Sequence, residues 1–395
     1  MVSNGCWNGG KDRKMGLNVN DYEEDRKHMS ALGRRKLIVF LVVSYGLTLL
    51  MDVFLYIGYK KEIDLSNFLI AQMMYPLAGV IIGKLFVEKD RSVPKGAFVT
   101  SLITTVLLVV IALLSVFFPM DAVRANDNGM TPYYIVSNLI IIVASVLFII
   151  LHFTCGAKNR KNAGLSHGNF GKSAIMIILF VGLYALRFTI SVILSCLAYG
   201  DSMTENFAAF GSNILSFESI TVLLVLVPNY FFTSIMFLGE EYGWRYYLQP
   251  IMQKKFGMRA GVVLLGLIWG LWHAGADMFF YTTTTGPQMI VSQLITCVSI
   301  GIFLAYAYMK TQNIWVPVIL HYINNNLIPI LKGDRTTASM QGSVIEWMDI
   351  PLSLVASIPF ILFILAPVFS KKSKESLFVT DNGNEALLRE EEVIQ

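Results

Sequence analysis

The chain has 395 residues, of which 55% are hydrophobic and only 15% are charged, and its mean hydropathy is +0.58. Soluble domains are closer to about 45–50% apolar and about 25% charged, so this composition excludes an ordinary soluble protein. The net charge is only +4 and forms no basic cluster, so we expect no nucleic-acid partner. The four cysteines are scattered without a CxxC pair, which predicts neither a disulfide framework nor a thiolate metal site.

The apolar residues form blocks of around twenty, the length of a helix that crosses a bilayer. We therefore predict an all-α fold, a polytopic transmembrane helical bundle with about ten spans. The expected spans cover about residues 37–58, 65–87, 97–118, 133–154, 173–199, 217–238, 260–281, 288–309, 313–331 and 350–369. They divide into N-terminal transmembrane helices (37–199), an intramembrane core (217–335) and a last transmembrane helix (350–369), flanked by a cytoplasmic polar arm (1–36) and a cytoplasmic tail (370–395).

The placement of Lys and Arg predicts the orientation, because these residues are enriched in loops on the cytoplasmic side. With ten spans and the N-terminus inside, most of the 31 Lys and Arg residues fall on the cytoplasmic side. Both termini are therefore predicted to be cytoplasmic, and the Glu240–Glu241 pair is expected at the cytoplasmic end of its span. The sequence shows no internal repeat, which argues against a transporter, since many transporters carry inverted repeats.

Three charged residues, Glu240, Glu241 and Arg245, directly follow the apolar run 220–238. Charge in such a setting is costly and marks a functional site by default. Glu241 and Arg245 are four residues apart, so they share a helical face and can pair. Glu240 points about 100° away from Glu241, which leaves it free to act as a general base. The alternative is an ion-paired helix end at the membrane interface.

Two histidines occur in apolar stretches further along the chain. His273 follows Trp269 by one helical turn, and Asp277 comes one turn later, where it could orient the His273 ring. His321 and Asn325 are also four residues apart and share a face, so both can donate to a developing oxyanion. Each of these groups could instead make a polar contact between helices.

The three stretches fall on neighbouring spans, and glycines near them let helix backbones approach closely. These glycines are Gly239, Gly243, Gly266, Gly270 and Gly275. We therefore predict that the three stretches meet inside the membrane and form one active site.

The order and spacing of these motifs resemble those of the CAAX-protease and bacteriocin-processing family of intramembrane proteases, also called Abi-type or CPBP proteins. The resemblance covers about residues 217–335 and rests on Glu240-Glu241-x-x-x-Arg245, Trp269-x-x-x-His273 and His321-x-x-x-Asn325. The second motif of the family usually begins with Phe, where this chain has Trp269. Because the aromatic ring is kept, we expect this exchange to have little consequence.

The resemblance also implies residue roles. Glu240 with His273 would activate a water for attack on a peptide carbonyl, and His321 with Asn325 would stabilise the oxyanion. Glu241, Arg245 and Trp269 would support the site. The family is often called a metalloprotease, so Glu240, His273 and His321 are also candidate ligands for zinc. The chain has no HExxH pair, and we favour a glutamate mechanism without metal.

The function implied by the resemblance is that of an endopeptidase, a multi-pass protein of the cell membrane that acts on a peptide or protein substrate at the bilayer. One alternative is a non-proteolytic membrane binding or bacteriocin immunity protein of the same fold, and a less favoured one is a transporter. Retention of every catalytic-type residue favours the protease.

Overall fold

The computed structural model describes residues 31–120, 130–332 and 343–370, and every regular element within these ranges is a helix. The prediction of an all-α membrane protein is thereby confirmed. Seven of the described helices are long and apolar enough to cross a membrane, and helix α12 is a shorter apolar helix. The predicted number of ten spans is not confirmed. Most of the predicted arm (1–36) and nearly all of the tail (370–395) lie outside the described residues.

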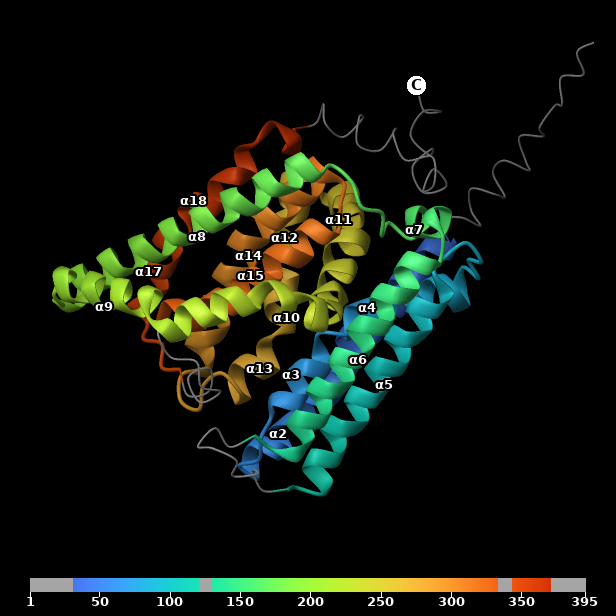
Figure 1. Cartoon of the computed structure of the whole chain (residues 1–395), viewed down its shortest axis with the longest axis horizontal. Helices are drawn as coiled ribbons and strands as arrows, with labels where there is room; N and C mark the ends of the chain where they lie inside the picture. The colour runs from blue at the N-terminus through green and yellow to red at the C-terminus, as the bar shows by residue number, and fades with distance from the viewer. Residues whose placement is uncertain (1–30, 121–129, 333–342, 371–395) are drawn as a thin grey trace, which may run out of the picture.

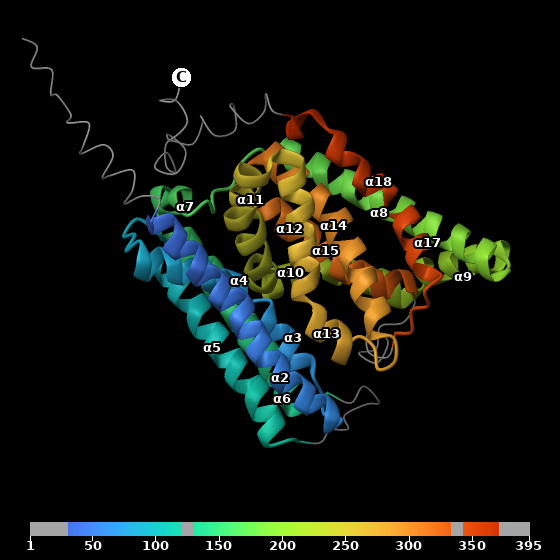
Figure 2. The ribbon, with the colours of Figure 1, turned by 180° about the vertical axis from the view of Figure 1, so that it is seen from behind.

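The N-terminal helices form one group on one side of the molecule (Figures 1 and 2). This group consists of α2 (Leu47–Lys60), α3 (Ser66–Gln72), α4 (Tyr75–Ile82), α5 (Lys95–Phe117) and α6 (Pro132–Thr154). Helix α2 continues an apolar helix that begins at Ala31 and includes the π-helical turn η1 (Val42–Gly46). Helix α5 contacts α3, α4 and α6, which ties the group together.

Most of the remaining helices form a second group beside the first, while the short helix α7 (Ala157–Asn162) lies at the end of the first group (Figures 1 and 2). The second group contains α8 (Phe170–Tyr199), α9 (Met203–Leu215), α10 (Phe217–Glu241), α11 (Gln249–Phe256), α12 (Met258–Trp272), α13 (Ala274–Phe279), α14 (Gly286–Thr311), α15 (Trp315–Lys332), α17 (Asp349–Ala356) and α18 (Ile358–Ile361). Helix α14 contacts α8, α12, α13, α15, α17 and α18. Helix α8 packs with this group, since it contacts α14, α15 and α17, and the predicted division of the chain at residues 199 and 217 remains a prediction.

Helix α10 joins the two groups, since it contacts α4 and α6 of the first and α15 of the second. It runs through the π-helical segment η3 (Tyr242–Leu248) into α11, so that one helix extends from Phe217 to Phe256. The predicted span 217–238 therefore ends too early, and Glu240 and Glu241 lie inside the helix rather than at its end. The charges do not end the helix because Glu241 and Arg245 neutralise each other within it.

Two other predicted spans are interrupted. The span 260–281 breaks at His273, between α12 and α13. The span 350–369 consists of short helices, α17, α18, η4 (Leu362–Leu365) and η5 (Pro367–Phe369). Pro359 and Pro367 lie in the first turns of α18 and η5, where proline starts a helix but cannot continue the preceding one.

Glycines let the helices around Glu240 approach closely, as the sequence predicted. A Cβ atom at Gly243 would lie 2.3 Å from Cβ of Pro76 on α4, and one at Gly266 would lie 2.7 Å from Cα of Val298 on α14. Both distances are far shorter than a carbon–carbon contact allows, so only glycine fits without a shift of the helices. A Cβ at Gly239 would lie 2.3 Å from the Met73 carbonyl oxygen and one at Gly270 3.0 Å from Cα of Leu294, whereas one at Gly275 would meet only the Asp52 side chain. Close backbone packing at four of the five glycines therefore surrounds the site.

Candidate active site

Glu241 joins two helices through a fully buried network. Its Oε2 accepts a hydrogen bond from Nε of Arg245 at 2.9 Å, and its Oε1 lies 3.0 Å from Nδ1 of His321 on α15. Glu241 and Arg245 have no exposed surface. The predicted pairing of Glu241 with Arg245 is therefore present, and it reaches further than predicted because the same carboxylate also holds His321.

Glu240 faces a different partner, as its position on the helix predicted. Its Oε2 accepts a hydrogen bond of 2.8 Å from Nε1 of Trp269 on α12. Glu240 is 2% exposed and Trp269 is 5% exposed. The bond occupies Oε2, and the buried indole N–H of Trp244, which makes no other hydrogen bond within the described residues, lies close to the same carboxylate.

His273 lies at the junction of α12 and α13, where its Nδ1 is 2.9 Å from the carbonyl oxygen of Trp269. A carbonyl oxygen only accepts hydrogen bonds, so Nδ1 carries the proton and Nε2 of the neutral ring keeps its lone pair. The helix tightens at this point, because the amide of His273 donates to Gly270 rather than to Trp269. The Trp269 carbonyl is thereby freed to hold the imidazole ring of His273.

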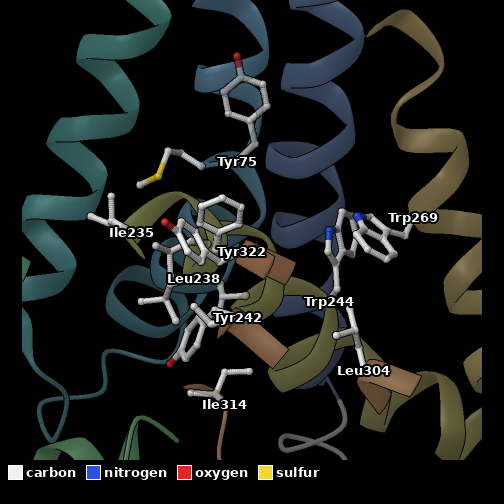
Figure 3. Close-up of a cluster of buried hydrophobic side chains, with 14 of the residues drawn as sticks. Tyr75, Ile235, Leu238, Tyr242, Trp244, Trp269, Leu304, Ile314 and Tyr322 are labelled. Carbon is white, nitrogen blue, oxygen red and sulfur yellow. The ribbon is translucent and has the colours of Figure 1, made fainter. Parts of the chain in front are cut away.

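Trp269 touches both parts of the site. Its ring lies 5.5 Å from the ring of His321 at an interplanar angle of 76°, and the guanidinium carbon of Arg245 lies 4.7 Å above the indole ring. Figure 3 shows Trp269 among the buried side chains that surround the site, together with Trp244 and Leu304. Contacts therefore run without a break from His273 through Trp269 to Glu240, and from Trp269 to His321, Glu241 and Arg245.

Asn325 lies one turn beyond His321 on α15, and its Oδ1 accepts a hydrogen bond of 2.9 Å from Nδ2 of Asn324. Its spacing places it on the same helical face as His321. The contacts of the structure do not join Asn325 to Glu240 or His273. Its inclusion in the site rests on its position on the helix.

Asp277 does not orient His273, contrary to the possibility raised from the sequence. The carbonyl of Trp269 holds Nδ1 of His273 instead. Asp277 is fully buried, and neither of its carboxylate oxygens has a hydrogen-bond partner.

Several residues that hold the end of α12 in place were not predicted. Nε2 of Gln72 donates to the carbonyl of Trp272 at 2.8 Å, Nε1 of Trp272 donates to the carbonyl of Ser44 at 3.1 Å, and the hydroxyl of Tyr45 donates to the carbonyl of Ile268. The last carbonyls of a helix lack partners within it, so these side chains complete the end of α12. The partners are 200 or more positions apart in the chain, and no local sequence pattern predicts such contacts.

The candidate ligands for a zinc ion at this site are Glu240, His273 and His321. Among the residues that the structure describes, no three His, Cys, Asp or Glu side chains lie close enough together to hold a metal ion. The Nδ1 atoms of both histidines are occupied by Trp269 and Glu241. Histidines that ligate a metal are commonly held in this way through their other ring nitrogen, so these bonds do not argue against zinc. Only the spacing of the three side chains does not fit the ligand set of a catalytic zinc.

Comparison with known families gives a match over residues 219–327, to the model described as Rce1-like, type II CAAX prenyl endopeptidase Rce1-like. The matched segment contains every predicted site residue from Glu240 to Asn325. The resemblance to the CAAX-protease family that the motifs indicated is thereby confirmed. No curated protein and no solved structure matched the chain.

Proposed function

Because residues 219–327 match a family of CAAX-type endopeptidases, we propose that this membrane protein is an intramembrane endopeptidase of the cell membrane. It hydrolyses a peptide bond in a membrane-associated peptide or protein. One observation carries the proposal: Trp269 holds Glu240 through its indole and His273 through its carbonyl, and leaves one reactive atom of each side chain available.

Glu240 and His273 activate the attacking water in this proposal. Oε1 of Glu240 and Nε2 of His273 are both able to accept a proton from a water placed between them. A positioned general base of this kind contributes about 10²–10⁴-fold to the rate. The proton taken from the water then passes to the nitrogen of the departing amine, so that the carboxylate returns to its starting form.

His321 and Asn325 stabilise the oxyanion that forms on the peptide carbonyl. Glu241 holds Nδ1 of His321, which leaves Nε2 as the donor when the ring is protonated, and the Asn325 amide adds a second donor. Removing one such donor costs about 10²–10³-fold in rate in other enzymes. Arg245 fixes Glu241 from the other side, so it acts on the oxyanion only through Glu241 and His321.

In this mechanism Glu240 and His273 activate the water without a bound metal. The alternative is a zinc-dependent enzyme, and a chelator distinguishes the two. The physiological substrate is a peptide or protein delivered from the bilayer.

The test is cleavage of a peptide library in liposomes that contain the purified protein. Wild type is compared with Glu240→Ala and His273→Ala, each with and without a zinc chelator. We expect wild type to cleave with and without chelator, and both variants to lose about 10²–10⁴-fold in rate. Loss of wild-type cleavage under chelator, with recovery on added zinc, would contradict the metal-free mechanism.

The same test decides the enzyme proposal itself. Folding of each variant is checked by its elution and its thermal transition in detergent. Wild type and variants that are all folded and equally inert would contradict an enzyme and leave a membrane binding or immunity protein of the same fold.

A further inference from the structure

Trp269 stands where the motifs of the family usually have Phe, and the structure gives this exchange a consequence. Phe would keep the ring and the backbone carbonyl, but it has no N–H group. The indole N–H is a donor only, and here it is used on Oε2 of Glu240 at 2.8 Å. The expectation that the exchange would have little consequence overlooked this bond.

The bond forms in surroundings where it fixes the carboxylate. Glu240 is 2% exposed and Trp269 is 5% exposed, so water does not compete for the donor. A hydrogen bond to an ionised group is shorter and stronger than one between neutral groups. A glutamate side chain has several rotatable bonds, and fixing one oxygen sets the direction of the other.

The Trp269 side chain is itself held on its other surfaces. The guanidinium of Arg245 covers its face at 4.7 Å, and the ring of His321 meets it at 5.5 Å. Backbone contacts from the N-terminal helices fix the end of α12 that carries it, through Gln72 and Tyr45. The indole N–H is therefore aimed at Glu240 by the packing around it.

We infer that Trp269 is a positioning residue, whose indole N–H orients Glu240 so that Oε1 faces the water that it activates. The inference rests on the proposed function, since it assigns a role within the same reaction. A phenylalanine at this position would keep the ring packing but could not orient the Glu240 carboxylate, because it lacks the indole N–H group.

The chain offers a matched control in Trp272. This residue lies three positions further along the chain, at the end of α12, it is 2% exposed, and its indole N–H also makes one hydrogen bond, at 3.1 Å to the carbonyl of Ser44. Trp272→Phe removes the same kind of donor from the same kind of surroundings. It leaves Glu240 and its bond untouched.

The experiment measures steady-state cleavage in liposomes of a quenched fluorescent peptide whose sequence wild type cleaves in the library. Trp269→Phe is expected to lower kcat by about 10- to 100-fold, the loss expected for a hydrogen bond to a charged group, with KM within about twofold of wild type. Trp272→Phe removes one of the bonds that hold the end of α12 but none to Glu240, so it is expected to lower kcat clearly less than Trp269→Phe does. The thermal transition of each variant reports whether the fold is kept.

A double-mutant cycle separates positioning from a general structural effect. In the Glu240→Ala background, Trp269→Phe should cause no further loss of the residual rate, because its target is gone. A further loss of the same size in that background would overturn the inference, and so would an unchanged kcat for Trp269→Phe. Equal loss in Trp269→Phe and Trp272→Phe would also overturn it. If wild type cleaves no peptide, the proposed function fails first and this inference fails with it.

Discussion

Adjacent glutamates have different surroundings because a helix turns by about 100° per residue. Glu241 is enclosed by Arg245 and His321, which use both of its oxygens. Glu240 accepts one hydrogen bond, from Trp269, and the indole of Trp244 lies close to the same carboxylate. The structure thus gives Glu241 to an ion pair and a histidine and leaves Glu240 outside that network, which supports the different roles proposed for the two carboxylates.

These different surroundings predict different effects on stability for two matched substitutions. Glu240→Gln keeps the shape of the side chain but removes the base, so we expect about 10²–10⁴-fold slower cleavage and a thermal transition close to wild type. Peptide cleavage in liposomes and the transition temperature in detergent, measured on the same sample, check this. A Glu240→Gln variant that cleaves at the wild-type rate contradicts the role of Glu240.

Glu241→Gln is expected to act on stability. It leaves the buried guanidinium of Arg245 without its carboxylate, and breaking a buried ion pair on one side costs about 3–5 kcal/mol. We expect a clearly lower transition temperature than for Glu240→Gln, together with a loss of activity that follows from the displaced His321. Wild-type stability in Glu241→Gln would show that this ion pair does not hold the site.

Spacing alone was enough to predict some of the site residues' contacts. The pair Glu241–Arg245 follows from four-residue spacing on a helix, and so does the separate direction of Glu240. The bond from Trp269 to Glu240 crosses 29 positions of the chain, and the bond from His321 to Glu241 crosses 80. Neither the partner nor the atom can be read from the sequence for such contacts.

At the scale of the helices, packing against glycine holds the site. Gly266→Ala would place a Cβ 2.7 Å from Cα of Val298, so α12 and α14 must move apart. We expect a loss of about 1–3 kcal/mol, the usual cost of overpacking, and slower cleavage. Gly182→Ala on α8 is the control, because nothing lies within 4 Å of a Cβ at that position. Equal stability of the two variants in a thermal melt would contradict the close contact of α12 with α14.

The beginning of α15, which carries His321 and Asn325, is held by the loop before α8. His167 lies between the rings of Phe153 and Trp315, at centroid distances of 5.5 and 5.3 Å, and its Nε2 is 2.9 Å from Nε2 of His152. Burial, together with the nearby Arg160, lowers the pKa of His167 below its ordinary value of 6.5. Its neutral form therefore belongs to the folded state.

This lowered pKa predicts a loss of stability in acid. As the pH falls below about 6.5, the unfolded chain binds a proton at His167 before the folded chain does, so the free energy of unfolding decreases. His167→Phe keeps a ring between Phe153 and Trp315 but cannot titrate. We expect the transition temperature of wild type to fall more than that of His167→Phe between about pH 7.5 and 5.5. An equal fall in the two proteins contradicts the contribution of His167.

Hydropathy predicted where most helices lie but not where some of them end. The span 217–238 was ended at the first charges, whereas the helix continues to Phe256 because its charges are paired internally. The helix breaks at His273, where the sequence has no Gly or Pro. The break is a tighter turn in which the His273 amide donates to the carbonyl of Gly270, three positions back. Where these helices end depends on which side chains and backbone groups pair in the folded protein. Hydropathy contains no information about such pairs.

At the scale of the whole molecule, two groups of helices enclose the site between them. The N-terminal group supplies Gln72, Ser44 and Tyr45 to the end of α12, while the second group carries all the predicted site residues. The family match over residues 219–327 covers only part of the second group. The N-terminal helices thus support the end of α12, which carries Trp269 and leads into His273.

The orientation in the membrane remains a prediction from the placement of Lys and Arg. In a variant without its native cysteines, single cysteines at positions 60 and 310 test it, since Lys60 and Lys310 are exposed ends of α2 and α14. We expect a membrane-impermeant maleimide added to intact cells to label Lys60→Cys and not Lys310→Cys. The reverse pattern would place the N-terminus outside the cytoplasm.

The central claim is that water activated by Glu240 hydrolyses a peptide bond, and product analysis in ¹⁸O-labelled water tests it most directly. Wild type and Glu240→Gln are incubated in liposomes with the same membrane-bound peptide, and the fragments are weighed by mass spectrometry. We predict two fragments from wild type, one of them with a single ¹⁸O in its new carboxyl group, and neither fragment from folded Glu240→Gln. Cleavage by Glu240→Gln at the wild-type rate, or fragments without ¹⁸O, would contradict the account.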